Sequence, residues 1–116
     1  MDCYQIYCDL KPGVKDTDFT DALTRYLNKL AAERRIEHWR LMRRKLGLGP
    51  SHFGEFQILI EVKNLMQLDE AFRAASERGD PVESLHAGVN QLVVNFQAAL
   101  YRDFPDPHRV RGQEKF

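Results

Sequence analysis

The sequence predicts an α+β domain with the ferredoxin-like βαββα(α)β order, in which helices cover one face of a four-stranded antiparallel sheet. Two observations lead to this prediction. Alternating apolar residues indicate strands at residues 3–9, 37–46, 53–62 and 92–101. Apolar residues at helical spacing fill the segments after the first and third strands. At 116 residues the chain fits one such domain, and we place it at residues 1–102 with a C-terminal tail at 103–116.

The first strand is rich in aromatic and β-branched residues and ends at a Lys-Pro-Gly turn signal. The period then becomes that of an amphipathic helix, with apolar residues every three or four positions from Phe19 to Ala31. Asp16 and Asp18 are expected to supply acidic and capping side chains at the start of this helix.

The second and third strands form a hairpin, because a Gly- and Pro-rich segment separates their two alternating runs. A second helix starts after Asn64, which has Gln three residues later as in a capping box. Its expected buried stripe is Leu65, Leu68, Ala71, Phe72 and Ala75. Asp80 and Pro81 then predict the start of a short third helix that runs to about Asn90.

Alternation divides the sheet into a core face and a mixed face. The core face collects Tyr4, Ile6, Cys8, Trp39, Leu41, Phe56, Ile58, Ile60, Val62, Val94, Phe96, Ala98 and Leu100. The mixed face collects Gln5, Tyr7, His38, Arg40, Met42, Arg44, Phe53, Glu55, Gln57, Leu59, Val93, Asn95, Gln97 and Tyr101. Water, nucleic-acid bases or a second protomer are the three partners open to the mixed face. The long apolar last strand favours an isologous homodimer that pairs sheet to sheet.

Composition narrows the classes of partner. Lys plus Arg and Asp plus Glu both number 17, so the net charge is zero, whereas polyanion-binding proteins are normally basic. No apolar run approaches the roughly 20 residues of a membrane span, and no signal peptide is recognised. Cys3 and Cys8 fall on opposite faces of one strand, which disfavours a disulfide. We therefore expect a cytoplasmic protein with reduced thiols.

Two groups of polar residues are candidates for a functional site. His86 and Asn90 share one face of the third helix, and together with His38 they are expected to line a pocket, although a capping or packing role for His86 is the simpler alternative. Trp39 and Tyr26 lie at core-periodic positions and are expected to pack in the core, with an aromatic pocket between helices and sheet as the alternative.

The second group lies on the mixed face of the predicted hairpin. His38 and Arg40 share that face with Glu55 and Gln57. Arg40 would hold an anionic group and His38 would act as general base, while a cross-strand ladder of salt bridges is the favoured alternative. The candidate catalytic residues are thus His38 and His86, and the candidate ligand-binding residues are Arg40, Tyr7, Gln57 and Asn90.

The segment from Asp80 to Val89 resembles the Pro- and His-containing helix of the stress-responsive branch of the dimeric α/β-barrel superfamily. The acidic-aromatic pair Asp103-Phe104 after the last strand is similar to that branch as well. The resemblance implies ferredoxin-like protomers that pair sheet to sheet as a homodimer. It selects no activity, because the superfamily includes monooxygenases, haem-degrading enzymes, small-molecule lyases and proteins without an assigned role.

These features predict a homodimer that binds or transforms a small organic molecule in a cavity. If it is an enzyme, a cofactor-independent oxygenase, isomerase or lyase is expected, because the sequence has no phosphate-cradling glycine motif and no metal-ligand spacing. A structural or interaction protein without catalytic activity is one alternative.

Single-stranded RNA binding is the other alternative. The segments Ile6–Leu10 and His52–Phe56 resemble the two signatures of RNA-recognition motifs, with Tyr7 and Phe53 placed to stack on bases. Glu55 stands where that family has a second stacking aromatic, and a carboxylate there repels phosphate. RNA is therefore not the expected partner.

Overall fold

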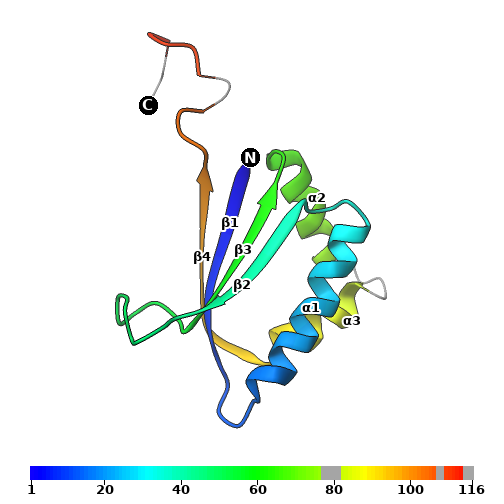
Figure 1. Cartoon of the computed structure of the whole chain (residues 1–116). Coiled ribbons are helices and arrows are strands. Elements are labelled where there is room, and N and C mark those ends of the chain that lie inside the picture. Colours follow the sequence, from blue (N-terminus) through cyan, green and yellow to red (C-terminus); the bar gives the residue numbers. More distant parts are fainter. Residues whose placement is uncertain (77–81, 107–108, 114–116) are drawn as a thin grey trace.

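A single four-stranded sheet carries three helices on one face (Figure 1). The structure, a computed structural model, describes residues 1–76, 82–106 and 109–113. The elements in chain order are β1 (Asp2–Leu10), α1 (Asp16–Ala32), β2 (His38–Arg43), β3 (Phe56–Val62), α2 (Leu65–Ser76), α3 (Val82–Asn90) and β4 (Val93–Arg102). The strand order is β2-β3-β1-β4 with antiparallel neighbours. This arrangement confirms the predicted ferredoxin-like fold.

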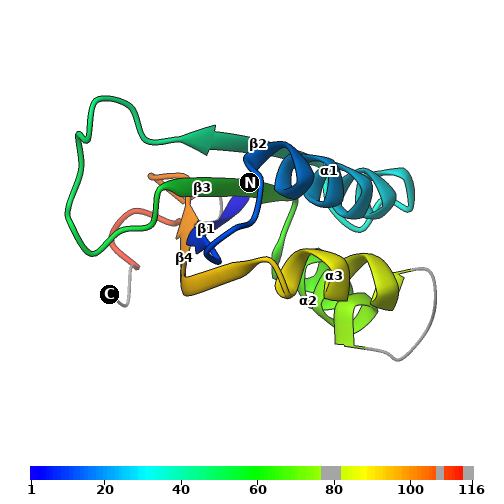
Figure 2. The same cartoon turned by 90° about the horizontal axis from the view of Figure 1, so that it is seen from below.

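The hairpin strands are shorter than predicted, because a long loop separates β2 from β3. The guanidinium Nη2 of Arg44 donates to the carbonyl oxygens of Pro50, Phe53 and Gly54 at 3.1, 2.6 and 3.3 Å, which closes the loop on itself. Arg44 and Phe53 therefore lie in this loop and not in strands, contrary to the prediction. The loop projects on the side of the sheet away from the helices (Figure 2).

The two predicted helix starts have different outcomes. The N-cap of α1 is Lys15, and no side chain caps the helix, so the predicted capping by Asp16 and Asp18 is wrong. Both aspartates lie in the first turn, as predicted, where their negative charge interacts favourably with the positive end of the helix dipole. The predicted capping box of α2 is confirmed, because Asn64 Oδ1 accepts from the Gln67 N–H at 2.9 Å and Gln67 Oε1 accepts from the Lys63 N–H at 2.7 Å. Asp80 and Pro81 lie outside the described residues.

A β-bulge at Asn95 changes which side chains of β4 face the core. The pairing of β1 with β4 shifts between Tyr7 and Asp9, and Asn95 has a φ of 56°. Val93 consequently packs against the core, whereas Val94 lies opposite Asp9 on the uncovered face. The prediction had these two valines reversed.

The Asp9 carboxylate holds the bulge in place. Its Oδ2 accepts from Asn95 Nδ2 at 3.0 Å, and its Oδ1 accepts from the Glu55 N–H at 2.8 Å. These two hydrogen bonds keep the pKa of Asp9 below its ordinary value. One side chain thus ties the end of β1 to both the β2–β3 loop and β4.

The helices bury the face of β3 completely but leave part of α2 exposed. The residues of β3 that face the helices, Phe56, Ile58, Ile60 and Val62, are all buried. On α2 the buried residues are Leu68, Ala71 and Ala74. Leu65 and Phe72, predicted to be buried, are instead 47% and 46% exposed. The apolar side of α2 therefore extends beyond the part of the sheet that it covers.

An ion pair joins the start of β1 to the end of β4, two adjacent strands, beside the C-terminal segment. Arg102 at the end of β4 donates to the buried carboxylate of Asp2 through Nε at 2.6 Å and Nη2 at 3.2 Å, and to Asp106 through Nη1 at 2.9 Å. Residues 103–106 run beyond the end of the sheet (Figure 1). Among the described residues, no helix has the length and apolar character needed to cross a membrane.

Replacing Gly54 with alanine should destabilise the fold. A Cβ atom at this buried position would lie 2.5–2.6 Å from the backbone of Cys8, so the loop and β1 must separate. We expect Gly54→Ala to lower the free energy of unfolding by about 1–3 kcal/mol, measured by urea denaturation.

Gly88→Ala in α3 is the matched control, because a Cβ atom there meets nothing within 4 Å. This change should leave stability unaltered or raise it by up to about 1 kcal/mol through helix propensity. Equal stability of Gly54→Ala and wild type would contradict the close approach of the loop to β1.

Candidate functional site

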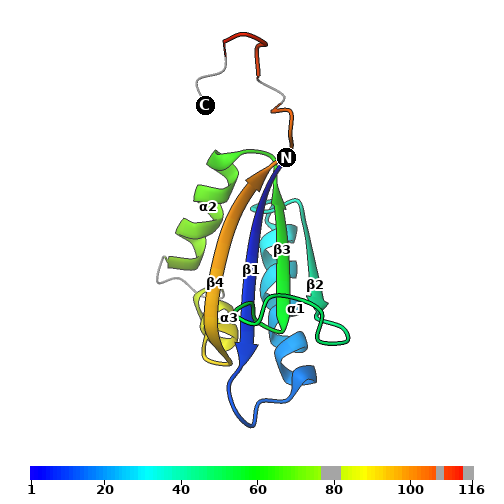
Figure 3. The same cartoon turned by 90° about the vertical axis from the view of Figure 1, so that its left-hand side faces the viewer.

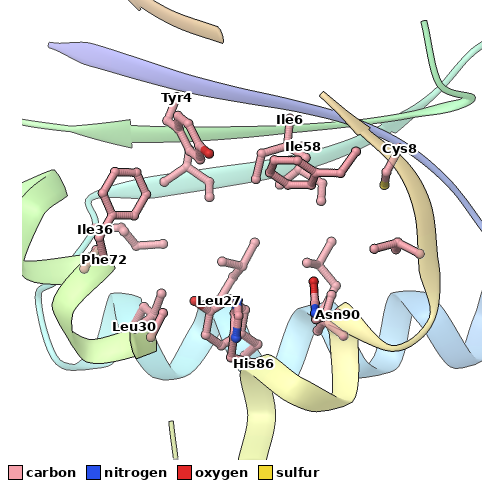
Figure 4. Close-up of a pocket in the computed structure, with 18 of the residues that line it drawn as sticks. Tyr4, Ile6, Cys8, Leu27, Leu30, Ile36, Ile58, Phe72, His86 and Asn90 are labelled. Atoms are coloured by element: carbon pink, nitrogen blue, oxygen red, sulfur yellow. The ribbon is translucent and has the colours of Figure 1, made fainter. Parts of the chain in front are cut away.

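A cavity of about 160 Å³ lies between the sheet and the helices. It is lined by Tyr4, Ile6, Cys8, Leu23, Tyr26, Leu27, Leu30, Ile36, Ile58, Ile60, Leu68, Ala71, Phe72, Ala75, His86, Val89, Asn90, Val93 and Phe96. Figure 4 shows side chains from the sheet reaching toward those from the helices across this space. None of the described lining residues is Asp, Glu, Lys or Arg, so the cavity suits a neutral and largely apolar molecule.

Four polar side chains line this otherwise apolar cavity. Tyr4 reaches in from β1, and His86 and Asn90 reach in from α3 on the opposite wall (Figure 4). Tyr26 of α1 lies beside His86, with ring centroids 5.4 Å apart in an edge-to-face arrangement. Within the described part of the chain, none of these four side chains makes a hydrogen bond. Their polar groups are therefore available to a bound molecule.

Burial raises the pKa of each weakly acidic group of the cavity further above neutral pH. Desolvation, with a smaller contribution from Tyr4, raises the pKa of Tyr26 to about 12, and desolvation also raises the pKa of Tyr4. The pKa of the Cys8 thiol rises to about 11 for the same reason, with Asp9 adding to the effect. Both tyrosines can therefore donate a hydrogen bond to a ligand, and Cys8 is a poor nucleophile.

The cavity reaches the surface between α2 and β4. Two of its lining residues, Phe72 of α2 and Phe96 of β4, are 46% and 57% exposed. Ala71 and Ala75 face the cavity from the same side of α2 and are too small to fill the space toward β4. This opening gives a ligand a route into the cavity.

The structure separates the predicted site residues onto two sides of the sheet. His86 and Asn90 line the cavity, as predicted, but His38 does not line it; the prediction of a shared pocket is wrong. His38 alternates with Trp39, which packs against the core, so it points to the uncovered face. Tyr26 packs against the core, as predicted, and also forms part of the cavity wall.

On the uncovered face, two of the candidate ligand-binding residues are already bonded to each other. Gln57 Nε2 donates to the Tyr7 hydroxyl and to Gln5 Oε1, both at 3.2 Å, and the Tyr7 hydroxyl donates to Gln5 Oε1 at 3.0 Å. The Tyr7 ring also packs on Phe53, with centroids 4.6 Å apart. This cluster holds the β2–β3 loop against β1.

The predicted cross-strand ladder of salt bridges is also wrong. His38 lies opposite Glu61 and Arg40 lies opposite Leu59, and neither side chain forms an ion pair with a described residue. Glu55 lies in the loop and binds Arg43 at 2.8 Å instead. Arg40 remains an exposed cation of the uncovered face.

Sequence reasoning missed most of the cavity wall, including Tyr4, Phe72 and Phe96. For Tyr4, the sequence did contain an indication: a tyrosine at a core-facing strand position brings a hydroxyl group that usually requires a hydrogen-bond partner or access to a cavity. Among the described residues, no group of three or more His, Cys, Asp or Glu is arranged to hold a metal ion.

Comparison with known proteins gives a family and a fold. The model of a family of unknown function, DUF6614, matches residues 1–116. No curated protein matches the sequence. Among solved structures, the chain is similar to the Arabidopsis thaliana protein At3g17210, with a TM-score of 0.70, 10% identity and coverage of 89% of this chain and 95% of that one.

Two further solved structures bear on the interpretation. SnoaB, a cofactor-independent oxygenase from Streptomyces nogalater, gives a TM-score of 0.69 at 7% identity and covers 93% of this chain and 97% of its own. A dimeric ferredoxin-like protein of unknown function from Thermobifida fusca gives 0.58 at 14% identity, covering 86% and 88%. At these identities the similarity establishes the fold alone.

The raised pKa of Cys8 predicts a loss of stability at alkaline pH. The unfolded thiol ionises above about pH 9, whereas the folded thiol stays protonated to about pH 11, so stability present below pH 9 is lost between these values. We expect this group to contribute roughly 2–3 kcal/mol to the loss, measured by urea denaturation at pH 8 and at pH 11.

Cys8→Ala should show a smaller loss of stability over this pH range than wild type, whatever its stability at pH 8. Cys3→Ala, on the other face of β1, serves as the control and should retain most of the pH dependence. Identical pH dependence in wild type and Cys8→Ala would show that the buried thiol does not govern this transition.

Proposed function

The chain belongs to the DUF6614 family of unknown function, and we propose that it is a homodimer whose protomers each bind a small neutral organic molecule in the cavity between sheet and helices. The observation that carries this proposal is the set of four unpaired polar side chains in an uncharged, largely apolar cavity. Such a combination of apolar walls and a few convergent polar groups is typical of ligand sites.

The size and chemistry of the cavity support a small, neutral ligand with one ring. Its volume of about 160 Å³ is close to that of engineered cavities of about 150 Å³ that bind benzene, so a single ring fits. Asn90 can both donate and accept a hydrogen bond, and Tyr26 beside His86 can donate one. A ring that carries a hydroxyl or carbonyl group meets these requirements, whereas an ionic group would lose its hydration without a counter-charge.

His86 is the residue that would support a reaction in this cavity. A ring hydroxyl or an acidic C–H of the ligand placed beside His86 could transfer its proton to the imidazole, which is the step that starts many cofactor-independent oxygenase, isomerase and lyase reactions. The fold shared with SnoaB, a cofactor-independent oxygenase, agrees with this class of chemistry. His86 is accordingly our candidate general base.

The uncovered face of the sheet supports the homodimer. It presents Tyr7, Leu59, Val94, Ala99 and Tyr101 among its polar residues. A second copy with the same face would remove these side chains from water through an isologous contact. Several solved structures of the same fold are described as dimeric.

Binding of phenol and benzene tests the cavity, with calorimetric titration as the measurement. Wild type should bind phenol more tightly than benzene, because the hydroxyl finds partners on His86 and Asn90. Asn90→Leu and His86→Phe keep an apolar wall of similar size but remove these partners, so each should reduce the preference for phenol by about threefold to tenfold.

His38→Ala and Arg40→Ala are the controls, since both residues lie on the opposite face of the sheet. They should leave binding of both probes unchanged. If wild type binds neither probe, or if only the two controls alter binding, the cavity is not the ligand site.

A charge on the uncovered face tests the homodimer. Leu59 lies near the middle of this face, opposite Arg40 on β2 and Gln5 on β1, so Leu59→Asp would place a carboxylate in a dimer contact that must remove it from water, and a pair with Arg40 would repay only part of that cost. Sedimentation should show a dimer for wild type and a monomer for Leu59→Asp.

Met66→Asp is the matched control, because Met66 is 73% exposed on α2 in the helical layer. It should sediment as a dimer, and circular dichroism should show that both variants are folded. A monomeric wild type at micromolar concentration, or a dimeric Leu59→Asp, would contradict the sheet-to-sheet contact.

A further inference from the structure

An apolar strip continues from the cavity along the edge strand β4. Leu100 lies directly opposite Tyr4, and Ala98 lies opposite Ile6. Opposed residues on neighbouring antiparallel strands project from the same face, so both side chains project on the cavity side of the sheet. Phe96 lines the cavity and lies on this same side. The strip therefore consists of Phe96, Ala98 and Leu100.

This strip is exposed although it lies on the helix-facing side of the sheet. Phe96 and Leu100 are 57% and 51% exposed, and Phe72, on the α2 side of the opening, is 46% exposed. Figure 3 shows β4 along the edge of the sheet with α2 to one side of it. The Phe72 ring meets the Tyr4 ring edge to face at 5.3 Å, which places one wall of the opening next to the strip.

The cavity alone is too small for a ligand larger than one ring. Its volume of about 160 Å³ matches a single aromatic ring, and its inner walls are formed by buried residues of α1 and β3. A longer ligand must extend outward through the opening between Phe72 and Phe96. There it meets the apolar strip, and its extension must be apolar as well.

We propose that the natural ligand is an elongated neutral molecule, with a ring-sized polar-substituted head in the cavity and an apolar extension that lies on the strip of Phe96, Ala98 and Leu100. This inference rests on the proposed ligand-binding function and adds the shape of the ligand. Phe72 and Phe96 bracket the point where the head joins the extension. Leu100 determines how much is gained from a longer extension.

A series of 4-alkylphenols, from methyl to hexyl, tests this inference by calorimetric titration. Full burial of a methylene group increases affinity about fourfold, and a strip that covers one side of the chain provides about half of that free energy. We therefore expect affinity to rise about twofold for each added methylene in wild type. In Leu100→Ser the rise should level off for the longer chains, while phenol itself binds as before, because Leu100 does not line the cavity.

Leu46→Ser is the matched control. Leu46 is 91% exposed in the β2–β3 loop, on the side of the sheet away from the helices, so its replacement should leave the whole series unchanged. Sedimentation of Leu100→Ser should show the same oligomeric state as wild type.

The outcomes separate this inference from the function on which it rests. If phenol binds but affinity does not rise with chain length, or rises equally in Leu100→Ser, the elongated ligand is overturned and the cavity site stands. If Leu100→Ser instead dissociates the dimer, the strip is covered by a second copy, and the inference is overturned as well. If phenol does not bind at all, the proposed cavity function itself fails.

Discussion

The helical layer stops short of the fourth strand, and the site depends on this offset. Ile58 and Ile60 of the inner strand β3 are 4% and 8% exposed, whereas Phe96 and Leu100 on the same side of β4 are more than half exposed. Small residues on α2 leave the intervening space unfilled. Because this space opens to the surface between Phe72 and Phe96, water can enter it, and a ligand that displaces this water from the apolar walls gains binding free energy.

The sheet separates two kinds of surface. On the helix side, the hydroxyl groups of Tyr4 and Tyr26 have no hydrogen-bond partner among the described residues, and burial raises the pKa of both. On the uncovered side, Tyr7 and Gln57 satisfy each other, and Phe53 covers the Tyr7 ring. Accessible polar groups without a protein partner can bond to a ligand, whereas a semi-apolar face whose polar groups bond to each other favours contact with another protein surface. A tyrosine is thus open to a ligand on the helix side, whereas on the uncovered side Tyr7 is part of a hydrogen-bonded cluster.

The sequence was sufficient where the period-2 alternation is unbroken. Along β1 and β3 it assigned every side chain to the correct face, and the element order followed. It failed at β4, because the bulge at Asn95 adds one residue that reverses the parity of the preceding valines. The prediction that Phe72 is buried also failed, because it assumed that the sheet lies under every apolar residue spaced three or four positions apart on α2. The bulge depends on the distant carboxylate of Asp9, which no local pattern reveals.

The bulge also determines the face of the sheet on which each side chain of β4 lies. On the C-terminal side of Asn95, Phe96 and Leu100 belong to the cavity side and Tyr101 to the uncovered side; on the N-terminal side, Val93 belongs to the cavity side. Without the bulge, simple alternation from Leu100 would move Val93 to the uncovered face. The face that a residue of β4 occupies thus depends both on the alternation along the strand and on the side of Asn95 from which it is counted. Asp9, which fixes the bulge, is therefore as important to the site as the side chains that line it.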